Sequence, residues 1–235
     1  MALVRKRSSS LTAAEQQRYI NTVTTLINNG KYGQLVAIHH QNHHQHSDMS
    51  GMSGMGGGKG RKRFLSWHRA FLLDLEKEIR ALDSKAFVPY WDWTSERQIP
   101  PWIAGFTPTV NVPGVGQVVV QRTPGHDYPT LPTAARINSI LKAKHYAEFT
   151  RRLELGPHGE VHEWVGGAMG NIMVSPSDPI FWMHHAQCDR IWSQWQVKNP
   201  GQGPGLTGAD ATMDPWTSTV SSLSSISKLG YSYGP

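Results

Sequence analysis

Histidine is the residue type in this sequence that offers the most for metal chemistry. The chain holds 12 His but a single Cys among 235 residues, and five of the His lie within residues 39–46. One Cys excludes a disulfide scaffold within the chain, Cys-rich zinc sites and Cys-ligated iron–sulfur clusters. A metal site in this chain must therefore be built from His or carboxylate ligands.

The spacing of several His places them where a metal could bind. His158 and His162 are four residues apart, so both imidazoles share one helix face and can grip one metal ion. His39, His68 and His185 each continue the apolar stripe of a predicted helix, where an imidazole without a partner is costly. A helix bundle lined by His favours metal ligation, and His ligands without Cys suit copper, zinc or iron.

Two common metal sites do not fit these motifs. Di-iron carboxylate bundles need two Glu-x-x-His motifs, and this chain has no such pair. The zinc-protease motif is absent too, because His162-Glu163 is followed by Trp-Val-Gly. A site with three His per metal would instead leave open positions for a small molecule such as O₂.

The elements that must position these His are mostly helices. Thr12 and Glu15 form a capping box before the first one, and Asp178-Pro179 resembles the start of the last. We predict an antiparallel helix bundle, mainly α, with long irregular loops and a small β hairpin. The whole chain, 1–235, is expected to be one domain, with a core at about 3–197. Five helices are predicted: one at 13–28, one that begins near 31, one that begins near 67, one at 134–153, and one that follows Asp178-Pro179 and ends near 197. Between them we expect a low-complexity loop at 47–60 and a hairpin around 113–116. Residues 199–235 should form an irregular tail that wraps on the domain or is partly loose.

Charge and hydropathy narrow the possible partners. The net charge is +6, and we interpret the basic run at 61–63 as part of a solvated loop. Basic residues do not alternate with aromatic ones, so we expect no nucleic-acid partner. No stretch approaches 18 apolar residues, and the basic N-terminus lacks the apolar segment of a signal peptide, so we expect no membrane span and a cytoplasmic location, with export by a partner left open.

Four motifs, in order, resemble the two copper-site regions of bacterial tyrosinases. They are FLSWHRAFLLDLEKEI (64–79), VPYWDW (88–93), HGEVHEWVGGAMG (158–170) and SPSDPIFWMHHAQCDRIW (175–192). Bacterial tyrosinases are type 3 dicopper phenol oxidases (polyphenol oxidases), and the resemblance covers residues 3–197. It implies two copper ions, O₂ as co-substrate, small phenolic substrates and a copper-delivery helper protein. The implied reaction oxidises o-diphenols to o-quinones, with weaker o-hydroxylation of monophenols, as in melanin formation.

The resemblance also implies ligands for each copper. The second copper would be held by His158, His162 and His185, with the adjacent His184 as a packing neighbour. The first copper would be held by His39, His68 and a middle His in the loop between the two helices. For this third ligand we favour His46, while His43 and His44 remain alternatives. The same loop carries Met49, Met52 and Met55, whose thioethers suit Cu(I), although a plain solvated loop explains them as well.

Residues around the second copper bear on the reaction. Relatives use a Glu upstream of the first His of this site to orient a water that removes the phenol proton, and Glu154 matches it. The residue after that His is usually Asn or Asp, but here it is Gly159. We therefore expect diphenol oxidation to dominate. Ile172 and Phe181 are expected to line the pocket, and Glu163 to face its entrance and disfavour substrates that carry a carboxylate.

Other functions fit the same ligands. A catechol oxidase or an o-aminophenol oxidase without monophenol activity would share all six His. An O₂ carrier resembling hemocyanin would need a shielding domain, for which 235 residues leave no room. A zinc protein without redox chemistry is a further alternative. Cys188 lies next to the predicted ligands of the second copper, so we interpret it as a core residue and expect no thioether bond at the first.

Overall fold

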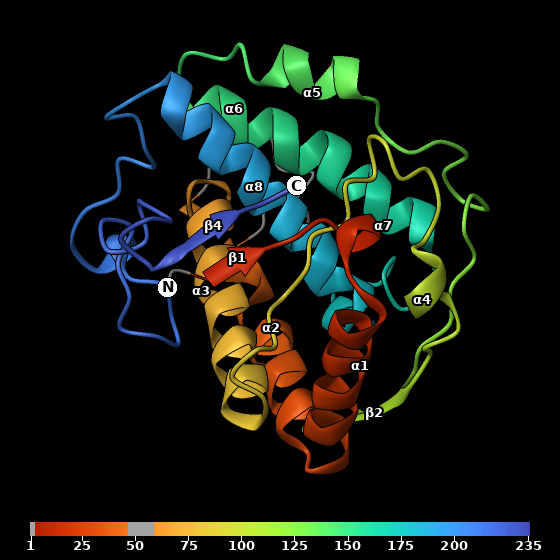
Figure 1. Cartoon of the computed structure of the whole chain (residues 1–235). Helices are drawn as coiled ribbons and strands as arrows, with labels where there is room; N and C mark the ends of the chain where they lie inside the picture. Colours follow the sequence, from red (N-terminus) through yellow and green to blue (C-terminus); the bar gives the residue numbers. More distant parts are fainter. Residues whose placement is uncertain (1–2, 47–58) are drawn as a thin grey trace.

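Helices dominate the computed structural model of this protein, which describes residues 3–46 and 59–235 without the side chains of 44–46 and 59 (Figure 1). The two sheets have only two strands each. The predicted mainly α class is therefore confirmed. The elements are α1 (Ala13–Asn28), α2 (Lys31–His46), α3 (Lys59–Leu82), α4 (Pro101–Ala104), α5 (Ala134–Ile140), α6 (Tyr146–Leu153), the π-helical turn η2 (Glu154–His158), α7 (Gly159–Val165), α8 (Ile180–Lys198), β1 (Leu3–Arg5), β2 (Thr109–Val112), β3 (Gly116–Val119) and β4 (Tyr231–Tyr233).

The first two helices begin where the sequence predicts. The backbone N–H of Glu15 donates to Thr12 Oγ1 at 3.3 Å, and the Thr12 N–H donates to Glu15 Oε2 at 2.9 Å, so the capping box forms. Gly30, at φ 81°, ends the turn after α1, and α2 follows at once from Lys31. The predicted hairpin is also present, with β2 and β3 antiparallel.

Helix α3 begins earlier than predicted, at Lys59 instead of near Trp67. The basic run at 61–63 is therefore helical, and its interpretation as a solvated loop was wrong. Arg63 is only 8% exposed, and its Nε donates to the carbonyl of Asp210 at 3.0 Å. A guanidinium that hydrogen-bonds to distant backbone carbonyls can lie on a buried helix face, which the local sequence pattern does not reveal.

The helix predicted over 134–153 is two helices, α5 and α6, separated by residues 141–145. Thr133 Oγ1 accepts the Arg136 N–H at the start of α5, and His145 adopts an extended conformation before α6. The break lets the carbonyl of Ala143 accept the indole N–H of Trp195 on α8, at 2.7 Å. The break between α5 and α6 thus coincides with a hydrogen bond from α8, a helix distant in the sequence.

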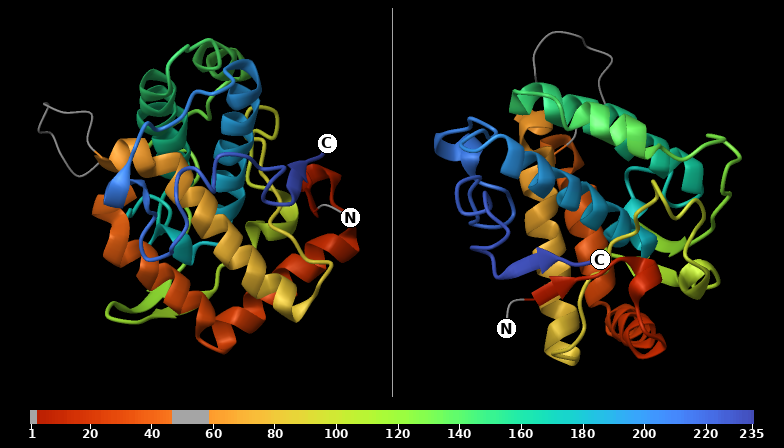
Figure 2. Two further views of the ribbon diagram at one scale, coloured as in Figure 1. Left: turned by 90° about the vertical axis from the view of Figure 1, so that its left-hand side faces the viewer. Right: turned by 45° about the horizontal axis from the view of Figure 1, so that its top comes forward.

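The two ends of the chain form a small parallel sheet. β1 pairs with β4, with Leu3 opposite Tyr231 and Arg5 opposite Tyr233, and both views in Figure 2 show the two strands side by side. The last residues of the predicted irregular tail are therefore an ordered strand, because the backbone of β1 supplies the hydrogen bonds that the local sequence cannot predict.

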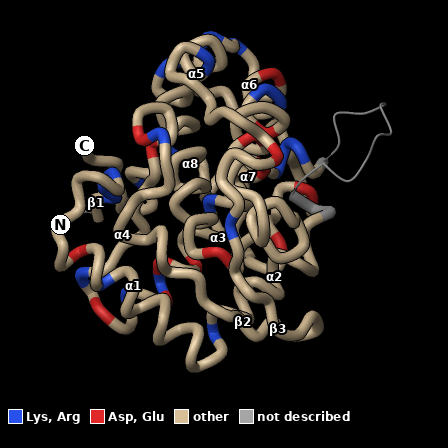
Figure 3. The backbone as a smooth tube through the Cα atoms, turned by 90° about the vertical axis from the view of Figure 1, so that its right-hand side faces the viewer, with Lys and Arg blue, Asp and Glu red and all other residues tan. Residues whose placement is uncertain are grey.

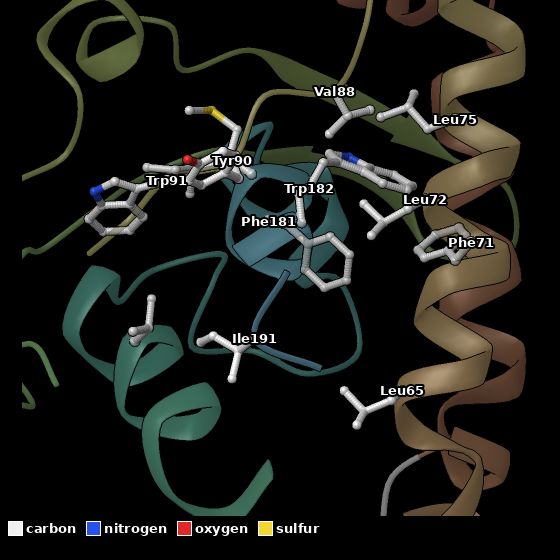
Figure 4. Close-up of a cluster of buried hydrophobic side chains, with 14 of the residues drawn as sticks. Leu65, Phe71, Leu72, Leu75, Val88, Tyr90, Trp91, Phe181, Trp182 and Ile191 are labelled. Carbon is white, nitrogen blue, oxygen red and sulfur yellow. The ribbon is translucent and has the colours of Figure 1, made fainter. Parts of the chain in front are cut away.

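The hydrophobic core lies between α3 and α8 and continues under the segment at 88–93. In Figure 4, Phe181 and Trp182 on α8 point toward Phe71 and Leu72 on α3. The rings of Phe71 and Trp182 are 4.4 Å apart, and both side chains are at most 1% exposed. Because α2 also packs on α3, the helices that carry the His are held around one core.

The distribution of charged residues and the hydropathy of the helices can be read from the fold. In Figure 3, Lys and Arg positions are interspersed with Asp and Glu positions along the drawn part of the tube. Among the residues that the structure describes, no helix is both long enough and apolar enough to cross a membrane.

Candidate metal centre

Five of the predicted His ligands come together around one pocket. They come from four helices and one π-helical turn: His39 from α2, His68 from α3, His158 from η2, His162 from α7 and His185 from α8. Most of the other lining residues are apolar. The pocket is lined by His39, Phe64, His68, His158, His162, Glu163, Met169, Gly170, Ile172, Ser175, Phe181 and His185.

His39 and His68 form one side of the pocket. His39 lies on the buried face of α2 and is 2% exposed, as its phase on the apolar stripe predicts. Its ring centroid is 5.9 Å from that of His68. His68 Nδ1 lies 2.8 Å from the carbonyl oxygen of Phe64, one turn earlier on α3. Because a carbonyl only accepts, Nδ1 carries the proton, and Nε2 of the neutral ring has a lone pair for a metal.

His158 and His162 face the pocket together, with ring centroids 4.7 Å apart. His158 Nδ1 donates to the carbonyl of Glu154 at 3.1 Å, and His162 Nδ1 donates to the carbonyl of Met169 at 2.7 Å. Both hydrogen bonds leave Nε2 with its lone pair. The two backbone carbonyls therefore hold both rings in the Nδ1–H tautomer.

A two-glycine turn brings the Met169 carbonyl back to His162. Gly166 and Gly167 end α7 with φ of 66° and 55°, in the left-handed region. A Cβ on Gly167 would lie 2.0 Å from the carbonyl oxygen of Gln121, so that position also has no space for a side chain. Only glycine allows this reversal, and the Gly-Gly in the motif HGEVHEWVGGAMG thus serves to position a His ring.

His185 closes the pocket from α8. Its Nε2 is 3.3 Å from His162 Nε2, and within the described part of the chain its Nδ1 has no hydrogen-bond partner. Nitrogens bound at about 2.0–2.1 Å to one tetrahedral metal are themselves about 3.3 Å apart, so this pair fits a shared ion. The ring of His185 also stacks on that of His68, with centroids 4.1 Å and planes 15° apart, so the two halves of the site adjoin.

Burial keeps these imidazoles neutral. It lowers the pKa of His68 to about 3 and that of His162 to about 4. Burial, together with the neighbouring imidazoles, holds the pKa of His39, His158 and His185 well below the usual value. Neutral imidazole is the form that binds metal, so the pocket is ready for a cation at neutral pH.

The same shifts predict how acid affects the metal-free protein. Below pH 6.5 an unfolded His binds a proton that the folded, neutral His68 does not bind until about pH 3. The free energy of unfolding should therefore fall by about 1.4 kcal/mol per pH unit for each such His as the pH drops below 6.5. Urea unfolding of metal-free protein at pH 7.5 and 5.5 measures this loss.

A His68→Leu variant is the control for that measurement, because it removes one of the titrating groups and should show a smaller loss between the two pH values. Equal stability of the metal-free wild type at pH 7.5 and 5.5 would contradict the burial of neutral imidazoles.

The other predicted site residues divide into two groups. Glu163, Ile172 and Phe181 are among the residues that line the pocket, and the Phe181 ring is 4.1 Å from that of His185. Glu154 and Gly159 are both buried beside His158 but are not among the described residues that line the pocket. The Glu154 carboxylate is fully buried, with the guanidinium of Arg61 at 3.7 Å.

The middle ligand of the first copper was expected in a loop, but α2 continues to His46, so all three candidates lie on the helix. His43 Nδ1 donates to the carbonyl of His40 at 2.8 Å. The structure does not describe the side chains of His44 and His46, and Met49, Met52 and Met55 lie outside the described residues.

Sequence reasoning missed some of the pocket residues. Phe64 lies one turn before His68, and its ring is 4.6 Å from that of His158. The helical period would have placed Phe64 on the His68 face, had α3 been predicted to start at Lys59. Met169 and Gly170 lie in a turn, and Ser175 begins the short 3-10 helix Ser175–Ser177. Both segments are too short to give a periodic signal in the sequence.

Comparison with known proteins agrees with this geometry. The common central domain of tyrosinase matches residues 29–124 and 116–198. A tyrosinase of Streptomyces galbus is 34% identical, with 91% of this chain and 92% of that protein covered. A tyrosinase of Streptomyces antibioticus is 31% identical over 92% of this chain and 94% of its own length.

A solved structure has the same fold. A functional unit of Octopus hemocyanin superposes with a TM-score of 0.79 and 22% identity, covering 100% of this chain and 68% of that one. At this identity the likeness concerns the fold alone. The family match and the Streptomyces relatives, which cover nearly the whole chain, identify this protein as a member of the tyrosinase family.

Proposed function

We propose that this protein is a type 3 copper oxidoreductase that uses O₂ to oxidise phenols, converting o-diphenols to o-quinones. The observation that carries the proposal is the set of five buried, neutral imidazoles around one mostly apolar pocket, in a chain of the tyrosinase family. The second copper would be held by His158, His162 and His185, and the first by His39, His68 and a middle His, for which His46 is the first candidate. Bound copper would supply the redox chemistry with O₂.

The residues around the metal have separable roles in this proposal. The carbonyls of Phe64, Glu154 and Met169 hold the Nδ1 protons of three ligands and so aim each Nε2 at the pocket. Phe181 and Ile172 give the pocket apolar walls that can receive a phenol ring. A diphenol then needs only to lose its hydroxyl protons and two electrons.

The decisive experiment is a panel of substrates offered to copper-loaded protein. Catechol, tyramine and o-aminophenol should separate the phenol oxidase, catechol oxidase and o-aminophenol oxidase activities, and coloured products should form with catechol in the presence of O₂. An O₂ carrier resembling hemocyanin, or a zinc protein, would give no turnover of catechol despite bound metal. Single His43→Ala, His44→Ala and His46→Ala variants, compared for copper content, identify the middle ligand.

Monophenol hydroxylation should be the weaker activity, since Gly159 offers no side-chain acceptor for the water that Glu154 is proposed to orient. A Gly159→Asn variant adds an amide oxygen there. The initial rate on tyramine, relative to that on catechol, should rise about tenfold, because about 1.4 kcal/mol is the scale of one net hydrogen bond.

The matched control is Gly159→Ala, which adds a Cβ and helix propensity without an acceptor. Glu154→Gln should lower the tyramine rate and spare the catechol rate. Equal tyramine-to-catechol ratios in the Asn and Ala variants would rule out the role proposed for the acceptor.

Glu163 should act as a charge filter at the pocket. Its carboxylate is exposed and lines the opening, so it repels the carboxylate of L-DOPA but not dopamine. In Glu163→Gln, kcat/KM for L-DOPA relative to dopamine should rise by up to about fivefold, the effect of about 1 kcal/mol between exposed charges.

Glu160→Gln serves as control, because Glu160 lies on the same helix but pairs with Arg136 at 2.6 Å and is not a lining residue in the described pocket. An unchanged L-DOPA-to-dopamine ratio in Glu163→Gln would argue against the filter. The helper protein for copper delivery and the cytoplasmic location stay predictions from the sequence.

A further inference from the structure

Helix α8 presents two adjacent imidazoles, His184 and His185, but only His185 lines the pocket. Both side chains are at most 1% exposed. One nitrogen of each, with one of His158 and one of His162, lies within 4.8 Å of all the others. Distance alone would therefore let either residue complete a site of three imidazoles, and some other feature must choose between them.

The hydrogen bond from Trp93 distinguishes His184. The indole Nε1 of Trp93 lies 3.1 Å from His184 Nδ1, and both side chains are fully buried. An indole N–H donates and never accepts, so Nδ1 must hold a lone pair. A neutral ring then carries its proton on Nε2, which lies 4.0 Å from the weak acceptor Cys188 Sγ. Neither nitrogen of His184 has a lone pair left for a metal.

His185 is in the opposite condition. Its Nε2 is 3.3 Å from His162 Nε2, and its Nδ1 accepts no hydrogen bond from any described residue. The Nδ1 proton of His162 is already given to Met169, so the facing nitrogen of His162 holds a lone pair. In the metal-free protein this contact is an N–H···N hydrogen bond from His185 Nε2 to the lone pair of His162 Nε2. A metal ion shared by the two nitrogens would replace that proton, and His185 Nδ1, which has no hydrogen-bond partner among the described residues, can carry it instead.

The position of Trp93 is itself fixed on α8. The N–H of Trp91 donates to the carbonyl of Met183 at 3.1 Å, and Gln187 Nε2 donates to Asp92 Oδ1 at 3.0 Å. These hydrogen bonds attach the segment before and after His184. The indole donor is therefore held against one ring of the pair.

The held ring in turn supports two proposed ligands. The ring of His184 lies parallel to that of His158, with centroids 5.4 Å and planes 19° apart, and meets the ring of His162 edge-on at 5.0 Å. His184 thus contacts the imidazoles of both His158 on η2 and His162 on α7, and its orientation restricts theirs.

We propose that Trp93 is a positioning residue that selects His185 as the copper ligand, by holding His184 in the Nε2–H tautomer as a support for His158 and His162. This inference rests on the proposed copper site. Loss of the indole donor would free His184 to move its proton to Nδ1 and to turn the Nε2 lone pair toward the metal.

The tautomer is measurable without any metal. Long-range ¹H–¹⁵N NMR spectra of the metal-free wild type should show His184 protonated on Nε2, and Trp93→Phe should show loss of this single form. Trp195→Phe is the matched control, since it removes an equally buried indole on α8 whose N–H donates to Ala143 instead. An Nδ1–H tautomer of His184 in the wild type would overturn the proposal.

Cobalt(II), whose visible spectrum responds to the number and geometry of its nitrogen ligands, tests the consequence. Its spectrum should differ between wild type and Trp93→Phe. In Trp93→Phe/His184→Gln it should return toward the wild-type form, because glutamine cannot supply the competing imidazole. An unchanged spectrum in folded Trp93→Phe would overturn the selection. Failure of the wild type to bind Cu(II) would instead contradict the proposed function. The NMR spectra of the metal-free protein would still show whether His184 carries its proton on Nε2.

Discussion

Replacing His185 with Ala should abolish catechol oxidation and lower the copper content from two ions per chain to about one. The Nε2 of His185 is 3.3 Å from that of His162, and its ring stacks on that of His68. Loss of this ring therefore leaves the second copper with two imidazoles, below the three that catalytic His sites use. Copper is measured by elemental analysis of the purified variant, and turnover by quinone absorbance.

The control for this prediction is His126→Ala. His126 is exposed and lies beside Asp127, at 2.8 Å, so its loss should leave copper content and catechol turnover unchanged. A His185→Ala variant that keeps both coppers and full activity would mean that His184 or another group is the ligand. His184→Ala, which should retain both coppers, then completes the comparison.

The five His that line the pocket could be picked out from the sequence because their signals are local. His39, His68 and His185 reveal themselves by their phase on apolar helical stripes, and His158 and His162 by their spacing, which fixes them on one face. Each of these signals needs only one helix. The structure brings the five together around one pocket, as a bundle of such helices must.

The features that the sequence does not predict depend on distant parts of the chain. Helix α3 extends back to Lys59 with Arg63 bonded to tail carbonyls, and the break before α6 accompanies the hydrogen bond from Trp195. The proposed tautomer of His184 likewise depends on the indole of Trp93, which is separated from it by 91 positions in the sequence. No window of periodicity contains both partners, so these contacts stay hidden until the fold is known.

The clearest such feature is the buried ionic cluster around Asp189. Its carboxylate accepts from Arg69 at 2.6 Å and from the hydroxyls of Tyr231 and Tyr233 at 2.7 and 2.5 Å. Arg5 adds a weaker ion pair at 3.5 Å. The cluster joins α3, α8 and both ends of the chain, and Arg69 directly follows the proposed ligand His68.

Asp189→Asn should lower the free energy of unfolding by about 3–5 kcal/mol, because it leaves the buried charge of Arg69 without its carboxylate. Burial alone would raise the pKa of Asp189, but Arg69, Arg5 and the Tyr hydroxyls outweigh it and hold the pKa below the usual value. The carboxylate therefore stabilises the fold fully above about pH 4, the unfolded value, and loses this effect as the pH falls through the lowered pKa. Urea unfolding of both proteins from pH 7 into acid measures the difference.

Asp127→Asn is the matched control, since Asp127 is exposed and its change should cost no more than about 0.5 kcal/mol. The difference between wild type and Asp189→Asn should narrow in acid, because protonation makes the wild-type side chain neutral as well. A difference that stays constant into acid would show that lost packing, not lost charge, explains the effect. Since Asp189 lies one turn after His185 and its partner Arg69 lies beside His68, the variant should also bind copper more weakly, which Asp127→Asn should not.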